Sequence, residues 1–171
     1  WLASNGTACI VCFPGIMYRG GAEQTIRKYL ITNNFVDCVI QLPSNLFFGT
    51  SIATCIVILK KNKQDNKVLF IDASKECVKV TNNNRLTDEN ISNIVDIYTK
   101  REDVQYVAHL ASFEEIEENK YNLSVSTYVD QEDTREKIDI VKLNAEMKEI
   151  VAREQKLREE IDKIIEEIDN G

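Results

Sequence analysis

The residue types that most often carry chemistry are sparse in this chain of 171 residues, which has five cysteines and one histidine. Cys9 and Cys12 form a C-x-x-C pair, a spacing that zinc sites and redox motifs use. They lie in an apolar run, and residues three apart on a strand point to opposite faces. One metal ion could not easily take both thiolates, and we find no titratable partner near His109 in the sequence. We therefore expect reduced, buried thiols in a cytoplasmic protein, no metal site and no catalytic role for His109.

A second possible chemistry is anion binding by the loop that contains Arg19, Gly20 and Gly21. This loop follows an expected strand, at the end where α/β sheets place ligands, and it leads into the N-terminus of an expected helix, which favours anions such as phosphate. The alternative is a plain turn that needs the permissive backbone of glycine. Lys60 is a further candidate for a phosphate contact or, alternatively, the cap of an exposed strand end. Arg27 and Lys28 fit the solvated face of a helix.

Apolar runs separated by turns predict the elements that position these residues. We expect strands at 7–13, 35–42, 52–59 and 68–71, a helix at 22–34, a polar turn or loop at 79–86, and helices from Thr87 to Arg101 and at 112–119. The first run is continuously apolar, which is typical of a strand buried on both faces. The helix between the first two strands predicts that they run parallel, and the short loop before the third predicts that it is antiparallel to the second. This order favours the α/β class.

Composition limits the classes of function. The chain is 43% hydrophobic and 29% charged with a net charge of −7, and no stretch approaches the roughly 18 apolar residues of a membrane span. Most of the net negative charge lies in residues 131–171. The acidic balance argues against a protein that coats nucleic acid with a general basic surface, but a local contact stays open.

The last 40 residues carry the clearest periodic signal. Apolar residues recur there at alternating intervals of three and four, with Glu154 as the one charged residue of the series. The series of apolar positions is Ile140, Leu143, Met147, Ile150, Leu157, Ile161, Ile164 and Ile168. Such a narrow stripe predicts a helix that packs with another chain as a coiled coil or small bundle; folding back on its own domain is the alternative.

Several separated motifs share one family pattern. They are FPG at 13–15, YRGGAE at 18–23, QLPSNLFFGT at 41–50, LKK at 59–61, FIDAS at 70–74 and YNLSVSTYV at 121–129. In these motifs the chain resembles the N6-adenine DNA methyltransferases and, more narrowly, the modification subunit of type I restriction-modification systems. The resemblance implies the C-terminal half of a class I methyltransferase (Rossmann-like) sheet in residues 1–75. A helical extension at 76–130 and a long coiled-coil helix for subunit assembly at 131–171 would follow.

The chain also departs from the family pattern. The family's Gly-rich cofactor loop is missing, and so is its catalytic Asn/Asp-Pro-Pro-aromatic tetrapeptide, because the only prolines are Pro14 and Pro43. In the family both elements lie upstream of the matching region. We therefore expect the C-terminal part of a subunit that transfers a methyl group from S-adenosylmethionine to N6 of adenine in DNA. By itself this part should contain no catalytic residue, bind no cofactor and not methylate.

The resemblance also implies how DNA is bound. Related enzymes stack the extruded adenine on an aromatic residue in the loop between the last two strands, and Phe47, with Phe48 beside it, falls there; a hydrophobic plug at the sheet edge is the alternative. Arg19, Gly20, Gly21 and Lys60 become candidates for the DNA backbone.

The implied partners are the specificity subunit, the restriction subunit and double-stranded DNA, with no membrane. The apolar stripe from Ile140 to Ile168 should bind the specificity subunit. Glu154 should disfavour self-pairing and favour a partner that supplies Lys or Arg.

Two other functions stay open. The half-sheet and coiled coil could form a non-enzymatic assembly module, or the chain could belong to a self-sufficient adenine methyltransferase with a fused specificity domain. A half-sheet makes one structural prediction, namely that the strand at 7–13 lies at a sheet edge without its neighbour.

Overall fold

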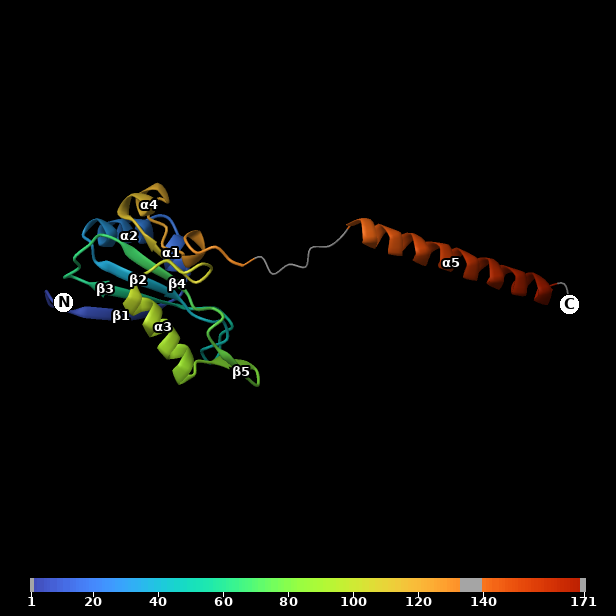
Figure 1. Cartoon of the computed structure of the whole chain (residues 1–171), viewed down its shortest axis with the longest axis horizontal. Coiled ribbons are helices and arrows are strands. Elements are labelled where there is room, and N and C mark those ends of the chain that lie inside the picture. Colours follow the sequence, from blue (N-terminus) through green and yellow to red (C-terminus); the bar gives the residue numbers. More distant parts are fainter. Residues whose placement is uncertain (1, 133–139, 170–171) are drawn as a thin grey trace. The chain divides into compact units, whose positions relative to one another are not determined.

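The computed structural model describes residues 2–132 and 140–169, which belong to two separate compact units, residues 1–132 and 133–171 (Figure 1). The first unit contains β1 (Thr7–Cys12), α1 (Gly15–Tyr18), α2 (Ala22–Thr32), β2 (Val36–Gln41), β3 (Cys55–Lys60), β4 (Val68–Asp72), β5 (Val78–Val80), β6 (Asn83–Arg85), α3 (Asp88–Lys100), β7 (Ala108–Ala111), α4 (Phe113–Glu118) and the 3-10 turn η1 (Val125–Thr127). The second contains α5 (Ile140–Asp169).

Five strands form one mixed sheet in the order β1-β3-β2-β4-β7. β3 is antiparallel to both β1 and β2, and β4 is parallel to β2 and antiparallel to β7. The expected antiparallel pairing of the second and third strands is therefore confirmed. β1 and β2 run in the same direction as expected, but they are not neighbours, because β3 lies between them.

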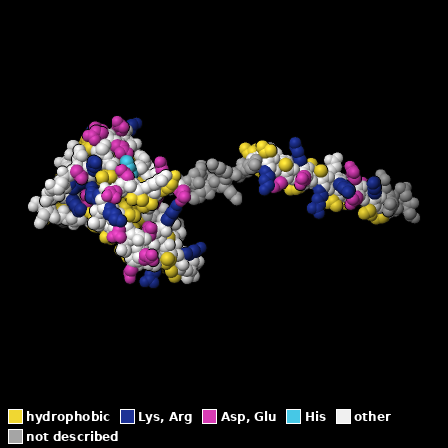
Figure 2. Space-filling model, in the orientation of Figure 1, with side chains coloured by type: hydrophobic (Ala, Val, Ile, Leu, Met, Phe, Trp, Pro, Cys, Tyr) yellow, Lys and Arg dark blue, Asp and Glu magenta, His cyan; other side chains and the backbone are white. Residues whose placement is uncertain are grey.

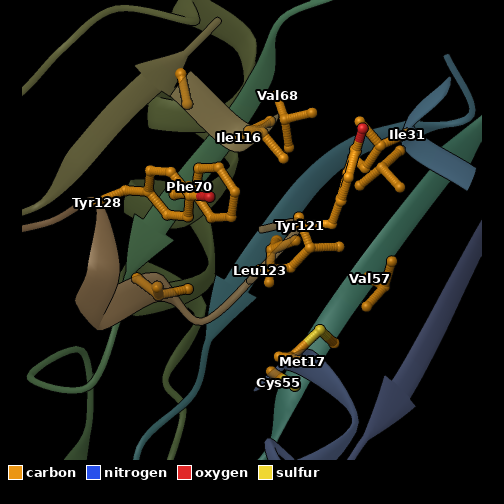
Figure 3. Close-up of a cluster of buried hydrophobic side chains, with 14 of the residues drawn as sticks. Met17, Ile31, Cys55, Val57, Val68, Phe70, Ile116, Tyr121, Leu123 and Tyr128 are labelled. Atoms are coloured by element: carbon orange, nitrogen blue, oxygen red, sulfur yellow. The ribbon is translucent and has the colours of Figure 1, made fainter. Parts of the chain in front are cut away.

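Helices cover both faces of the central strands, which makes the protein a mixed α/β fold. In Figure 1, α1, α2 and α4 lie on one side of the sheet and α3 on the other. Residues alternate along β4, so that Val68 and Phe70 join one buried cluster while Leu69 and Ile71 join the other. The first cluster, drawn in Figure 3, includes the ring of Tyr128 stacked on Phe70 with 3.9 Å between centroids.

β1 is not buried on both faces, contrary to our expectation. Ile10 is 48% exposed and Val11 is 54% exposed. The reason is the place of β1 at the edge of the sheet, where β3 is its one strand neighbour among the described residues. The prediction that this strand lies at an edge is confirmed.

Local structure differs from the expectation in three further places. Residues 79–86, expected as a polar turn or loop, contain the turn but also most of a two-stranded hairpin, β5–β6, in which Val78↔Arg85 and Val80↔Asn83 pair. The loop after β1 contains the short helix α1. Residues 76–130, expected as a helical extension, also contribute β7, whose four residues are too few to show a pattern in sequence.

The remaining helices follow the sequence closely. Thr87 caps α3 in a reciprocal capping box with Asn90, and the hydroxyl of Ser112 accepts a hydrogen bond from the backbone N–H of Glu115 in α4. α5 is one continuous helix of 30 residues. The helix expected at 131–171 includes residues 133–139, which lie outside the described part of the chain. Of the described helices, none is long and apolar enough to cross a membrane.

Candidate functional site

The loops that carry chemistry gather at one edge of the sheet. β1, β2 and β4 run in the same direction, so their carboxyl ends share an edge, and this is where α/β sheets place their ligands. Three segments follow these ends: the loop from Phe13 to Gly21, the loop at 42–54 and the β5–β6 hairpin. We refer to this edge as the carboxyl edge and to residues 42–54 as the aromatic loop.

The aromatic loop is closed at its neck by short hydrogen bonds. The N–H of Leu42 donates to the carbonyl oxygen of Thr54 at 2.9 Å, and the Gln41 side chain donates to the same oxygen at 3.1 Å. Closer to the tip of the loop, the N–H of Asn45 donates to the carbonyl oxygen of Ser51 at 3.4 Å. The neck therefore fixes where the loop leaves the sheet.

The tip of the aromatic loop carries Phe47 and Phe48 in solvent. Phe47 is 42% exposed and Phe48 is 98% exposed, whereas Leu46 packs against a buried cluster. The described residues therefore leave the ring of Phe48 uncovered. Two aromatic faces are thus available to a planar ligand at the carboxyl edge.

The loop with Arg19, Gly20 and Gly21 lies at the same edge and is exposed. Gly21 has a φ of 73° and requires glycine, whereas Gly20 would accept a side chain without contact. The Arg19 guanidinium lies over Gly15, where an added Cβ would approach it to 3.1 Å. Of the two adjacent glycines, only Gly21 is required by its backbone conformation.

Arg27 is not on a solvated face, which corrects our expectation. Its side chain is buried and donates to the carbonyl oxygens of Tyr121 at 2.8 Å, Ile16 at 2.6 Å and Arg19 at 2.7 Å. These bonds fasten α2 to the loop after β1, so Arg27 positions that loop. Its neighbour Lys28 is exposed, as expected.

Lys60 lies at the opposite edge, because β3 runs against β1 and β2. Its ammonium is 2.9 Å from the buried carboxylate of Asp37, which also accepts from Arg101 at 2.9 Å and from the Tyr98 hydroxyl at 2.6 Å. Burial by itself would raise the pKa of Asp37, but Tyr98, Lys60 and Arg101 together lower it. The structure therefore does not bring Lys60 together with Arg19 and Phe47.

All five cysteines are free, but only two of them are buried, whereas we expected buried thiols. Cys38 and Cys55 are buried, Cys12 is intermediate and Cys9 is exposed, because β1 lies at the sheet edge. The sulfurs of Cys12 and Cys55 are 3.7 Å apart across β1 and β3. In the part of the chain that the structure describes, no group of three His, Cys, Asp or Glu residues could hold a metal ion.

His109 does have titratable partners. Its Nδ1 is 2.9 Å from Asp103 and its Nε2 is 3.0 Å from Glu115, a carboxylate on each side. Asp103 lies in the segment before β7 and Glu115 in the first turn of α4. Both carboxylates therefore reach the His109 ring, although each is six residues away in sequence.

Comparison with known proteins connects this geometry to a family. The model for N-6 DNA methylases matches residues 1–137. The chain belongs to the N-6 DNA methylase family. The family resemblance found in the sequence motifs is thus confirmed.

Two relatives of this N-6 DNA methylase chain are methylase subunits. It is 49% identical over 168 residues to the type I restriction enzyme MpnII methylase subunit of Mycoplasma pneumoniae, covering 98% of this chain and 31% of that protein. It is 39% identical over 158 residues to the MjaVII methylase subunit of Methanocaldococcus jannaschii, covering 89% and 27%. The chain thus spans less than a third of the length of these relatives.

A solved structure agrees with the fold of this N-6 DNA methylase chain. The type I restriction-modification methyltransferase subunit from Streptococcus thermophilus superposes with a TM-score of 0.72 at 53% identity. The match covers 73% of this chain and 27% of the other. The sheet described above therefore corresponds to part of a larger methyltransferase subunit.

Proposed function

We propose that the chain is part of the methyltransferase subunit of a type I restriction-modification enzyme, which methylates N6 of adenine in DNA. The observation that carries the proposal is the pair of exposed phenylalanines on the aromatic loop at the carboxyl edge. Family membership and the methylase relatives support it. The subunit would work in the cytoplasm.

The role of the aromatic loop follows from the chemistry of the target. The N6 amine of adenine lies in a base pair, so the base must leave the duplex to be methylated. An extruded base loses stacking, and an aromatic side chain can return about 1–3 kcal/mol per base. Phe47 and Phe48 present such rings, and we assign them to the target adenine.

The methyl donor does not fit the residues of this chain. After β1, the first strand of the chain, Gly15 is covered by the Arg19 guanidinium, and α1 occupies the loop. The chain has neither a Gly-rich cofactor loop nor a Pro-Pro tetrapeptide. S-adenosylmethionine and the catalytic residues would therefore belong to the part of the subunit outside this sequence.

The DNA backbone would be contacted by the exposed loop with Arg19, Gly20 and Gly21. This loop shares the carboxyl edge with Phe47, so that one duplex could contact both. Lys60 is left out of the DNA surface, because its ammonium is paired with Asp37 at the opposite edge.

The rest of a class I methyltransferase sheet would add to β1. One side of β1 has no strand partner among the described residues, and a groove of about 230 Å³ lies beside it, lined mainly by apolar side chains such as Ile10, Ile26 and Leu30. A strand on β1 with a segment in this groove would cover both features. This chain would then form the C-terminal half of the sheet.

α5 would bind the specificity subunit as a coiled coil or small bundle, and the restriction subunit would join the same assembly. All eight apolar positions of its stripe, from Ile140 to Ile168, are exposed, between 47% and 71%. Figure 2 shows hydrophobic side chains between the charged ones along this helix. A helix of this kind needs a partner to be stable in water.

Methylation by the assembled subunits tests the proposal. Phe47→Ala and Phe48→Ala should each lower methylation, because stacking of the extruded base is lost. The ring that stacks more closely on the base should give the larger loss, of about 5- to 100-fold. With 2-aminopurine in place of the target adenine, the fluorescence rise on extrusion should fall in parallel. Tyr29→Ala, which removes an exposed ring from α2, is the control.

The same measurements separate the alternative. If both phenylalanine variants methylate as well as Tyr29→Ala and lose only stability, the rings are structural and the assembly-module function is favoured instead.

A further inference from the structure

The aromatic loop is braced by one residue of the β5–β6 hairpin. The backbone N–H of Asn84 donates to the carbonyl oxygen of Asn45 at 2.8 Å, and its side-chain Nδ2 donates to the carbonyl oxygen of Ser44, also at 2.8 Å. Two consecutive carbonyl groups of the loop are thus bound by a residue about 40 positions away in sequence. Asn84 is half-buried between the two segments.

These bonds fall where the loop has no support from the sheet. The neck bonds at Leu42 and Thr54 fix the base of the loop, and the Asn84 bonds fall two and three residues before Phe47. Asn45 itself has a φ of 52°, a left-handed conformation that an L-residue adopts at some cost. The two hydrogen bonds hold the carbonyl groups on either side of the Asn45 Cα. They therefore set the direction in which the part of the aromatic loop with Phe47 and Phe48 leaves the core.

The brace is itself anchored. Leu86, just after β6, packs against the same buried cluster as Leu46 of the loop. At the other end of the hairpin, the Glu76 carboxylate accepts from the side chains of Asn90 and Asn93 in α3, at 3.0 and 3.3 Å. Asn84 is thus connected to α3 and the core, and can transmit their rigidity to the loop.

We propose that Asn84 is a positioning residue for base extrusion, which orients the aromatic loop so that Phe47 and Phe48 meet the extruded adenine. This inference rests on the proposed function of the loop and adds a residue to it. Rigid support matters because a reactive geometry is lost with displacements of about 1 Å. Asn84 acts through the loop and does not touch the base.

The experiment uses the complete methyltransferase with its specificity subunit and duplex DNA that carries 2-aminopurine at the target position. Asn84→Ala removes the bond to Ser44, and Asn84→Asp replaces its donor with an acceptor of the same shape. One lost hydrogen bond should lower the extruded fraction and kcat by about 3- to 10-fold, and Asn84→Asp should lower them at least as much. The dissociation constant for DNA should rise by no more than the same factor, because extrusion follows binding.

Asn83→Ala and Asn83→Asp are the matched controls. Asn83 is the preceding residue of β6, is exposed, and adds the same charge when changed to Asp. The controls should show wild-type extrusion and kcat. They separate loss of the brace from a general effect of charge on DNA binding.

Two outcomes overturn the inference. One is that the Asn84 and Asn83 variants behave alike; the other is that Asn84→Ala lowers the melting temperature and DNA affinity together with kcat, which indicates a general role in folding. If Phe47→Ala and Phe48→Ala lower methylation while Asn84→Ala does not, only this inference fails. If the phenylalanine variants are also silent, the proposed function itself fails.

Discussion

At the scale of single residues, the two buried charged side chains among the described residues, Arg27 and Asp37, fix loops and helices. Arg27 binds three carbonyl oxygens of two other segments, and Asp37 gathers Lys60, Arg101 and Tyr98. A buried charge is costly unless it is paired, so each of these groups needs its partners in place. Arg27, expected on a solvated face, and Lys60, expected as a possible phosphate contact, therefore have structural roles.

His109 gives a prediction about pH. Burial alone would lower its pKa, but the hydrogen bond and charge of Glu115, together with Asp103, raise it above the ordinary value. Because the folded pKa is above the unfolded one, the stabilisation is fully present below about pH 6.5, the unfolded pKa, and is lost as pH rises through the folded pKa. Glu115→Gln should lower the pKa and weaken this dependence.

The measurement is an NMR titration of the ring, which is unambiguous because the chain has one histidine. Glu114→Gln, at an exposed neighbour, is the control. An unchanged His109 pKa in Glu115→Gln would show that the pair contributes nothing.

At the scale of elements, α5 is the least self-sufficient part. Val151 and Ile165 are exposed as well, at 55% and 51%, one position beyond the core stripe. They widen the apolar face beyond what a two-helix seam covers, which favours a bundle with more than one partner helix. Glu154 interrupts the stripe, and its carboxylate accepts from Arg158 within the same helix at 2.7 Å.

Glu154 in the apolar stripe gives a prediction about self-association of α5. Glu154→Leu should strengthen self-association by about 10-fold or more, because a charge is replaced in the core position by an apolar side chain worth roughly 1.5–3 kcal/mol on burial. Analytical ultracentrifugation over a concentration series measures this. Glu159→Leu adds the same side chain at an outer position and should leave self-association unchanged. Equal behaviour of the two variants would mean that the stripe is not the pairing surface.

At the scale of the whole molecule, β1 is the boundary at which the sheet ends. Ile10 and Val11 are adjacent in a strand, so they point to opposite faces, and both are about half exposed. An edge strand that is apolar on both faces attracts further chains. In the complete subunit, the proposed additional strand would cover it.

A lysine on β1 should therefore have opposite effects in the two contexts. In the chain described here, Val11→Lys should reduce aggregation on heating, measured by light scattering. In the complete subunit it should lower the free energy of unfolding by about 1–3 kcal/mol, because a covered position receives a charge. Val80→Lys, at a similarly exposed valine of the β5–β6 hairpin, is the control. If Val11→Lys is equally harmless in the complete subunit, nothing adds to β1.

The sequence by itself determined what depends on local pattern and motif. Apolar runs located the strands from β1 to β4. Thr87 marked the start of α3, helical spacing located α4, and the 3–4 spacing located α5. The separated motifs identified the family. These signals are encoded in residues close together in the sequence, so they can be found without knowledge of the tertiary structure.

Only the tertiary structure decided which distant residues meet. It placed β3 between β1 and β2, buried Arg27, paired Lys60 with Asp37 and carried Asn84 to the aromatic loop. Asn82, Asn83 and Asn84 are identical in type, and nothing in the sequence distinguishes the one that binds Ser44. Long-range pairing depends on how strands are ordered and which loops share an edge, and such geometry exists only once the sheet has formed.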